Sequence, residues 1–191
     1  MVKALEHGEH AQHAAEHGNK LAALVVAILA AFLAVSEQQA KLAEIKVANN
    51  AVLAADSWNQ YQGKSTRQLV SSDLASVVDT MDKPADPALA EARAKVAARL
   101  HEDVKRFQED PKDGKEAIAR RAGEFEHIRD VSLERAHAFD KAAASLELGI
   151  VLATASAITS SKMLIRFAIA LGSFGVLLAV LGLTDPELVP F

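Results

Sequence analysis

Residues 21–36 read LAALVVAILAAFLAVS, a run of 16 residues without a charged side chain between Lys20 and Glu37. As a helix rising about 1.5 Å per residue, the run is about 24 Å long, which suffices with its flanking residues to cross a bilayer. A buried helix of a soluble core normally keeps a polar stripe, and this run has none on any face. The sequence therefore predicts a transmembrane helix at residues 20–36.

A second apolar run, at residues 167–184, lies near the C-terminal end. Its 18 residues carry no charge between Arg166 and Asp185. The run is about 27 Å long as a helix and predicts a good transmembrane span.

A third apolar run, at residues 148–161, precedes it and is shorter. It reaches a full span only if the helix begins near residue 142 and takes Glu147 into the interfacial layer, where a carboxylate near a helix end is tolerated. We expect this transmembrane helix at residues 144–161 and a tight turn at residues 162–166. A re-entrant or interfacial helix is the alternative.

Charged residues concentrate between the apolar runs. Hydrophobic residues make up 50% of the chain and charged residues 24%, and the two are segregated rather than mixed as in a soluble domain. Residues 37–143 hold 17 Lys or Arg and 19 Asp or Glu, so no basic field marks a nucleic-acid partner. The absence of cysteine excludes disulfides, thiolate zinc sites and cysteine nucleophiles.

The charged segment, residues 37–143, predicts a helical, coiled-coil-like stalk. One helix continues from the first apolar run to about residue 81, where the sequence KPADP breaks it. A second helix is expected at residues 87–109, and a third begins near residue 115 and runs unbroken into the next apolar run. Because narrow apolar stripes do not stabilise single helices in water, these helices should pack on one another or on copies of the chain.

The orientation in the membrane follows from the short flanking segments. Lys3, Lys20, Lys162 and Arg166 share one side of the membrane. Short positive segments favour the cytoplasm, which favours a periplasmic stalk. Lysines and arginines also flank the membrane on the stalk side, so the sequence leaves the opposite orientation open.

A leader at residues 1–19 is rich in histidine and glutamate. As an amphipathic helix it brings His10, His13 and His17 to one face, and the last two, four residues apart, can share a zinc or nickel ion. The alternative is an amphipathic helix lying on the membrane surface with merely polar histidines. We expect no firmly held cofactor, and at most weak zinc or nickel binding.

Candidate packing positions lie in the stalk and in the apolar runs. Trp58 and Tyr61, three residues apart on one helix face, are expected to pack between stalk helices, with an aromatic ligand platform beside Lys64 as the alternative. Small residues four apart let helices approach closely in lipid. These residues are Ala23, Ala27 and Ala31 in the run at 21–36, Gly149, Ala153 and Ala157 in the run at 148–161, and Ala168 and Gly172 in the run at 167–184.

The stretch ADSWNQYQGKS at residues 55–65 has the spacing W-x-x-Y-Q-x-K just after the first apolar helix. This motif resembles the signature of the bacterial DUF4337 family. The leader at residues 6–18, the polar stretch at residues 124–140 and LELGIVLATASAIT at residues 146–159 are also similar to the family. The resemblance covers nearly the whole chain and implies the same topology and a bacterial inner membrane, but no reaction. Glu147 departs from the glutamine usual in the family.

Together these features predict an all-α membrane protein with three transmembrane helices and a stalk domain between the first and second. We expect a non-enzymatic scaffold or accessory subunit that contacts lipid and forms a homo-oligomer or joins a larger membrane complex. Association is expected through the stalk and the small-residue faces. An oligomeric channel or transporter-like assembly is the alternative, and metal binding by the leader a minor one.

Overall fold

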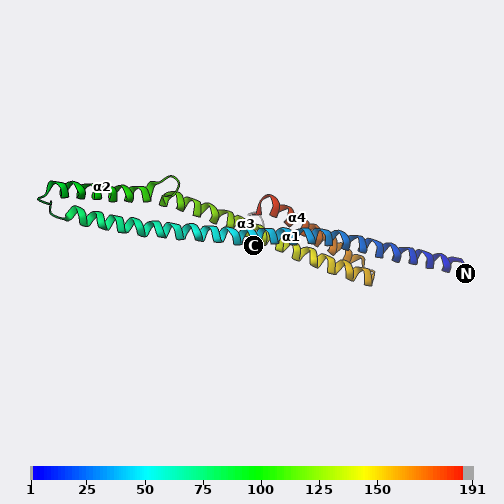
Figure 1. The fold of residues 1–191 in the computed structure, drawn as a ribbon. Helices are drawn as coiled ribbons and strands as arrows, with labels where there is room; N and C mark the ends of the chain where they lie inside the picture. Colours follow the sequence, from blue (N-terminus) through cyan, green and yellow to red (C-terminus); the bar gives the residue numbers. More distant parts are fainter. Residues whose placement is uncertain (1, 187–191) are drawn as a thin grey trace. The chain divides into compact units, whose positions relative to one another are not determined.

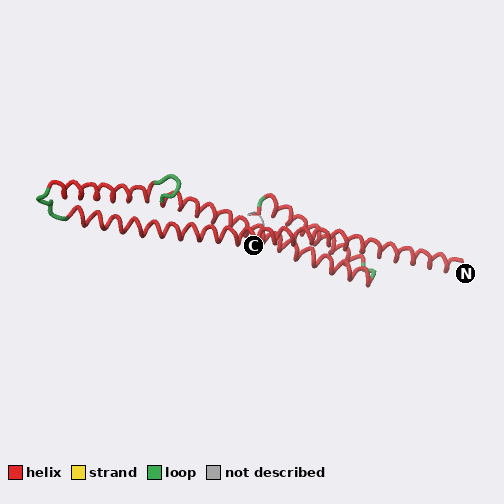
Figure 2. The backbone as a smooth tube through the Cα atoms, viewed as in Figure 1, coloured by secondary structure: helices red, strands yellow, loops and turns green. Residues whose placement is uncertain are grey.

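The computed structural model describes the backbone of residues 2–186 and the side chains of residues 20–186. All regular structure in this part of the chain is helical, which confirms the all-α fold (Figures 1 and 2). The elements are α1 (Val2–Thr80), α2 (Pro87–Glu109), α3 (Lys115–Thr159) and α4 (Lys162–Thr184).

Two compact units divide the chain. The terminal unit comprises residues 1–47 and 130–191, and the hairpin unit comprises residues 48–129. Helices α1 and α3 each contribute one part to both units, while α2 belongs to the hairpin unit and α4 to the terminal unit.

The helix ends of the hairpin unit follow from local sequence. Helix α1 ends at Thr80, just before the predicted break, and α2 has the predicted bounds. The Asp86 carboxylate accepts a hydrogen bond of 2.9 Å from the backbone N–H of Ala88, and Pro87 fills the first helical position, where no N–H is needed. At the N-terminal end, the backbone of the predicted leader is continuous with α1.

The turn between α2 and α3 is organised by Asp110. Its Oδ1 accepts 2.9 Å hydrogen bonds from the backbone N–H groups of Asp113 and Lys112. The bond from Asp113, and next the bond from Lys112, lower the pKa of Asp110 below its ordinary value because they stabilise the charged carboxylate. Gly114 ends the turn, and a Cβ there would lie 2.5 Å from the Asp110 backbone nitrogen. This close approach requires glycine.

The turn between α3 and α4 is shorter than predicted. Helix α4 begins at Lys162, so residues 162–166 form its first turn and do not form the connection. Ser160 adopts a left-handed φ of 54°, and Ser161 precedes the helix, so two residues reverse the chain. The prediction was wrong because residues 162–166 contain good helix formers and no Gly, Pro or Asn.

Glycines bring α3 and α4 together in the terminal unit. A Cβ on Gly175 would lie 3.0 Å from the Ala142 carbonyl oxygen and 2.9 Å from Leu146 Cγ. The Ser145 hydroxyl donates a 2.9 Å hydrogen bond to the Leu171 carbonyl oxygen across the same contact. The two antiparallel helices therefore pack nearly backbone to backbone.

Replacing Gly175 with alanine should therefore destabilise the protein relative to the same change at Gly63. A Cβ on Gly63 would have no atom within 4 Å, so Gly63→Ala gains up to about 1 kcal/mol of helix propensity. Gly175→Ala forces the helices apart at a cost of about 1–3 kcal/mol. Unfolding followed by circular dichroism in detergent measures both, and equal stabilisation by the two variants would contradict the close packing.

Candidate functional site

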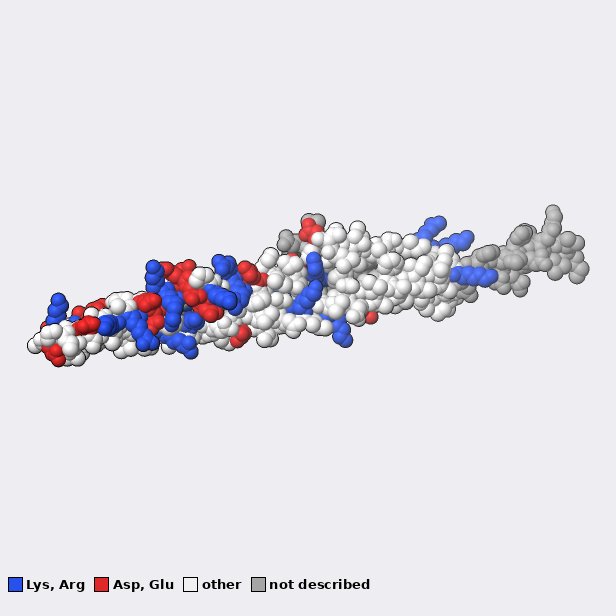
Figure 3. All heavy atoms as spheres, turned by 45° about the horizontal axis from the view of Figure 1, so that its top comes forward, with Lys and Arg blue, Asp and Glu red and all other residues white. Residues whose placement is uncertain are grey.

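Three described helical segments are long and apolar enough to cross a membrane. They lie in α1 from Lys20, in α3 and in α4. Figure 3 shows the uncharged surface of this part of the terminal unit, with lysine and arginine side chains at its ends. Large apolar side chains face outward here, among them Leu24, Ile28, Val151, Ile158 and Phe174. By length and composition, these three helical segments are candidates to cross a membrane.

The predicted small-residue stripes of the last two runs lie inside the chain. Gly149 and Gly172 are buried, Ala153 and Ala168 are fully buried, and Ala157 is half-buried. A Cβ on Gly149 would approach the Ala168 carbonyl oxygen to 3.2 Å. These residues join α3 to α4 within one copy.

The stripe expected on the first run is not its contact face within the chain. Ala23, Ala27 and Ala31 are exposed, whereas Ala22 and Leu29 are buried. Alanine is so frequent in this run that its spacing does not identify one face.

Leu29 connects α1 to the α3–α4 pair. Its side chain fits the hollow left by Gly149 and Gly172, and a Cβ on Gly149 would lie 3.0 Å from Leu29 Cδ1. An apolar groove of about 510 Å³ runs beside this contact, between α1 and α4. Its lining residues are Leu21, Leu24, Val25, Ile28, Leu29, Phe32, Ile169, Gly172, Ser173 and Val176.

Glu147 lies close to the contact that aligns the three apolar segments. It precedes Gly149 by two residues, about 3 Å along the helix. Gly149 packs against both Leu29, the ninth of the 16 residues of the run at 21–36, and Gly172, the sixth of the 18 residues of the run at 167–184. The sequence could not show this depth, because it depends on how the three helices align.

In the hairpin unit, Trp58 and Tyr61 contact each other and α3. Their rings meet edge to face with centroids 5.6 Å apart. The Trp58 indole donates a 3.0 Å hydrogen bond to Glu126 Oε1, and Lys115 Nζ lies 5.2 Å from the Tyr61 ring centroid. The aromatic pair thus bridges two helices, although Trp58 remains 36% exposed.

The bond between Trp58 and Glu126 should be measurable by a double-mutant cycle. We expect Trp58→Phe and Glu126→Ala each to reduce the free energy of unfolding by about 0.5–1.5 kcal/mol, because each removes one partner. The double variant should lose less than the sum of the two losses. Thermal unfolding gives these values, and strict additivity would show that the bond contributes nothing.

A second feature of the hairpin unit was not predicted from the sequence. Inward positions of α1 recur three and four residues apart, through Ser71, Ala75 and Val78, while the residues just before them are apolar yet exposed. On α2 no residue is buried, and Leu89 and Val96 are both more than half exposed. We name the exposed set the hairpin face: Val70, Leu74, Val77, Met81, Leu89 and Val96.

A contact between His101 and Asp79 shows that the hairpin face lies on one side of the hairpin. His101 Nε2 lies 3.0 Å from Asp79 Oδ2. Each of these residues directly follows an inward position, Leu100 or Val78. In antiparallel helices, residues that follow inward positions therefore share one side, and residues that precede them share the other. The signal in the sequence is the 4-3-4 spacing of Val70, Leu74, Val77 and Met81.

Metal ligands are not brought together among residues 20–186. No group of three or more His, Asp or Glu side chains in that range is placed to hold an ion. The candidate ligands His10, His13 and His17 lie outside the described side chains.

Comparison with known families agrees with the resemblance seen in the sequence. The model of the domain of unknown function DUF4337 matches residues 18–185. The chain belongs to the DUF4337 family. The match begins at the end of the histidine-rich leader, so it covers all three apolar segments and the whole hairpin unit. No curated protein and no solved structure matches the chain.

Proposed function

We propose that this DUF4337 protein is a non-enzymatic scaffold or accessory subunit of a bacterial inner membrane, and that copies assemble through the hairpin face. The observation that carries the proposal is an apolar surface in the charged unit. Leu74 and Val77 are 51% and 55% exposed there, far along α1 from the uncharged run at residues 21–36. Exposed apolar patches rimmed by polar residues mark interaction sites.

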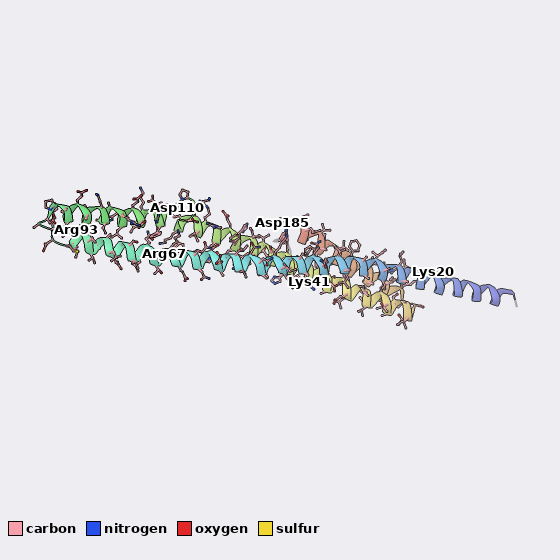
Figure 4. All side chains as sticks on the ribbon, in the orientation of Figure 1. Lys20, Lys41, Arg67, Arg93, Asp110 and Asp185 are labelled. Carbon is pink, nitrogen blue, oxygen red and sulfur yellow. The ribbon has the colours of Figure 1, made fainter. Side chains whose placement is uncertain are left out.

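Self-association is favoured over a foreign partner by the charges at the edges of the face. Asp73 lies at its edge on α1, and Arg99 at its edge on α2. Asp73 and Arg99 lie at the same height along the hairpin within about one helical turn. Two hydrogen bonds between α1 and α2 set this alignment: Gln68 donates to the Val104 carbonyl oxygen, and Asp79 contacts His101. In Figure 4, Arg67 marks α1 and Arg93 marks α2 of the hairpin unit that contains Asp73 and Arg99.

A two-fold axis parallel to the hairpin places α1 of one copy against α2 of the other. Asp73 of each copy then faces Arg99 of the other, and the apolar residues meet between them. An antiparallel pairing would instead set the Lys95 and Arg99 edges of the two copies against each other. Charge complementarity thus supports the parallel arrangement, which also suits two copies inserted alike in one membrane.

The small-residue stripes of α3 and α4, expected from the sequence to join copies, pack within the chain, so this proposal rests on the hairpin unit. In the terminal unit, Lys20 directly precedes the uncharged run of α1, and Lys162 and Arg166 lie at the start of α4, next to the turn from α3. Their charge supports a cytoplasmic turn and a periplasmic hairpin.

Assembly is tested first by mass in mild detergent. We expect the purified protein to have a protein mass that is a defined multiple of 20.4 kDa, and vesicles containing it to stay impermeable to ions. Asp73→Arg and Arg99→Asp should each weaken assembly by pairing like charges, and the double variant should restore it. A monomeric wild-type protein would contradict the proposal, and ion flux would favour the channel instead.

Cysteine cross-linking tests the face itself, since the chain has no native cysteine. A Val77→Cys variant mixed with a Val96→Cys variant should form a disulfide-linked dimer on mild oxidation, because α1 of one copy lies against α2 of the other. Ser72→Cys, exposed on the opposite side of the same helix, is the matched control and should not. Cross-linking of the control alone would place the contact on the wrong face.

A further inference from the structure

Glu147 is an ionisable residue close to the level at which the three apolar segments contact one another. The nearest charged residues on its own helix are Lys141 and Asp140, about 9–10 Å away along the axis. From the Leu29–Gly172 contact level, Lys20 and Glu37 on α1 are about 12–13 Å away, and Arg166 on α4 about 9 Å. Lys162 and Asp185 lie still farther along α4. Charged groups therefore flank this level from both ends.

The outward face of α3 around Glu147 is apolar. Glu147 itself is exposed, and its neighbours Leu148 and Val151 are 58% and 62% exposed. Within residues 20–186, no hydrogen bond or ion pair is formed by the Glu147 carboxyl. An ionised carboxylate without a partner is costly in hydrocarbon, whereas the protonated form costs much less and can donate a hydrogen bond.

A polar group on another outward face lies at the same depth. Ser173 directly follows Gly172, is exposed, and lines the apolar groove between α1 and α4. Its hydroxyl has no hydrogen-bond partner in the described part of the chain. Glu147 on α3 and Ser173 on α4 are thus two unpaired polar groups close to the same level, as the contacts of Gly149 with Gly172 require.

We propose that Glu147 is a proton-binding site in the hydrocarbon layer, and that its carboxyl O–H donates a hydrogen bond to Ser173 Oγ of a second copy. The proposal rests on the proposed membrane insertion and self-association. Rotation about the membrane normal keeps each group at its depth, so α3 of one copy can meet the α1–α4 groove of the next. The groove is apolar except near Ser173, so Glu147 of the second copy can form a hydrogen bond at one level of the groove only.

Carbodiimides test whether the carboxyl is protonated in lipid. Dicyclohexylcarbodiimide, which partitions into membranes, adds to a protonated carboxyl without a leaving group, so the protein gains the mass of one reagent. We expect this addition at Glu147 in membranes containing the wild-type protein and none at this position in Glu147→Gln. A water-soluble carbodiimide should leave Glu147 unmodified. Modification by the water-soluble reagent alone would overturn the proposal.

Association in vesicles tests the partner group. Energy transfer between labelled full-length copies should be kept in Glu147→Gln, whose amide still donates, and weakened roughly three- to tenfold in Glu147→Leu and Ser173→Ala. Unchanged association in both variants would overturn the contact. Asp73→Arg separates the two proposals, because it should weaken assembly through the hairpin face while leaving the carbodiimide reaction intact.

Discussion

Lipid gives apolar helices little reason to prefer one another over acyl chains, so close packing must hold them together. The contact of Leu29 with Gly149 and Gly172 supplies this packing in the terminal unit. Gly175 brings the α3 and α4 backbones close farther along the same pair. This one contact also aligns the three apolar segments with one another, and the depth of Glu147 and Ser173 follows from that alignment.

Both units expose large apolar side chains, and we propose that each exposed surface is covered in a different way. Outward leucine, valine and phenylalanine side chains of the terminal unit need no protein partner if lipid covers them. Outward Leu74 and Val77 of the hairpin unit lie beyond the uncharged run at residues 21–36, and exposing them to water is unfavourable. We therefore propose that lipid covers the exposed apolar surface of one unit and a second copy covers that of the other.

Much of the fold could be predicted because its signals are local. Pro84, Pro87 and the residues around Asp110 fix helix ends through missing donors and capping bonds, and the apolar runs fix three long segments. The turn at Ser160 and Ser161 was missed because its left-handed residue is neither glycine nor asparagine. Local sequence gave no reason to place the reversal there.

The candidate sites were less predictable because they depend on alignment between helices. Glu147 looked like an edge residue when counted along its own helix, and only the alignment of the three helices places it near the level of Leu29. The hairpin face was missed for a related reason. Val70, Leu74 and Val77 form an apolar stripe that the sequence alone suggests is buried. In the structure the neighbouring stripe, through Ala75 and Val78, faces inward instead.

The central claim is that the three apolar segments of the terminal unit lie in a bilayer and the hairpin unit in water. Single cysteines introduced at Ile28, Val151 and Leu177, with Ser72→Cys as the hairpin counterpart, test it by labelling with a membrane-impermeant maleimide in membranes opened on both sides. We predict that the three apolar positions are labelled only after detergent denaturation, whereas residue 72 is labelled at once. Rapid labelling at the three apolar positions in intact bilayers would contradict the account.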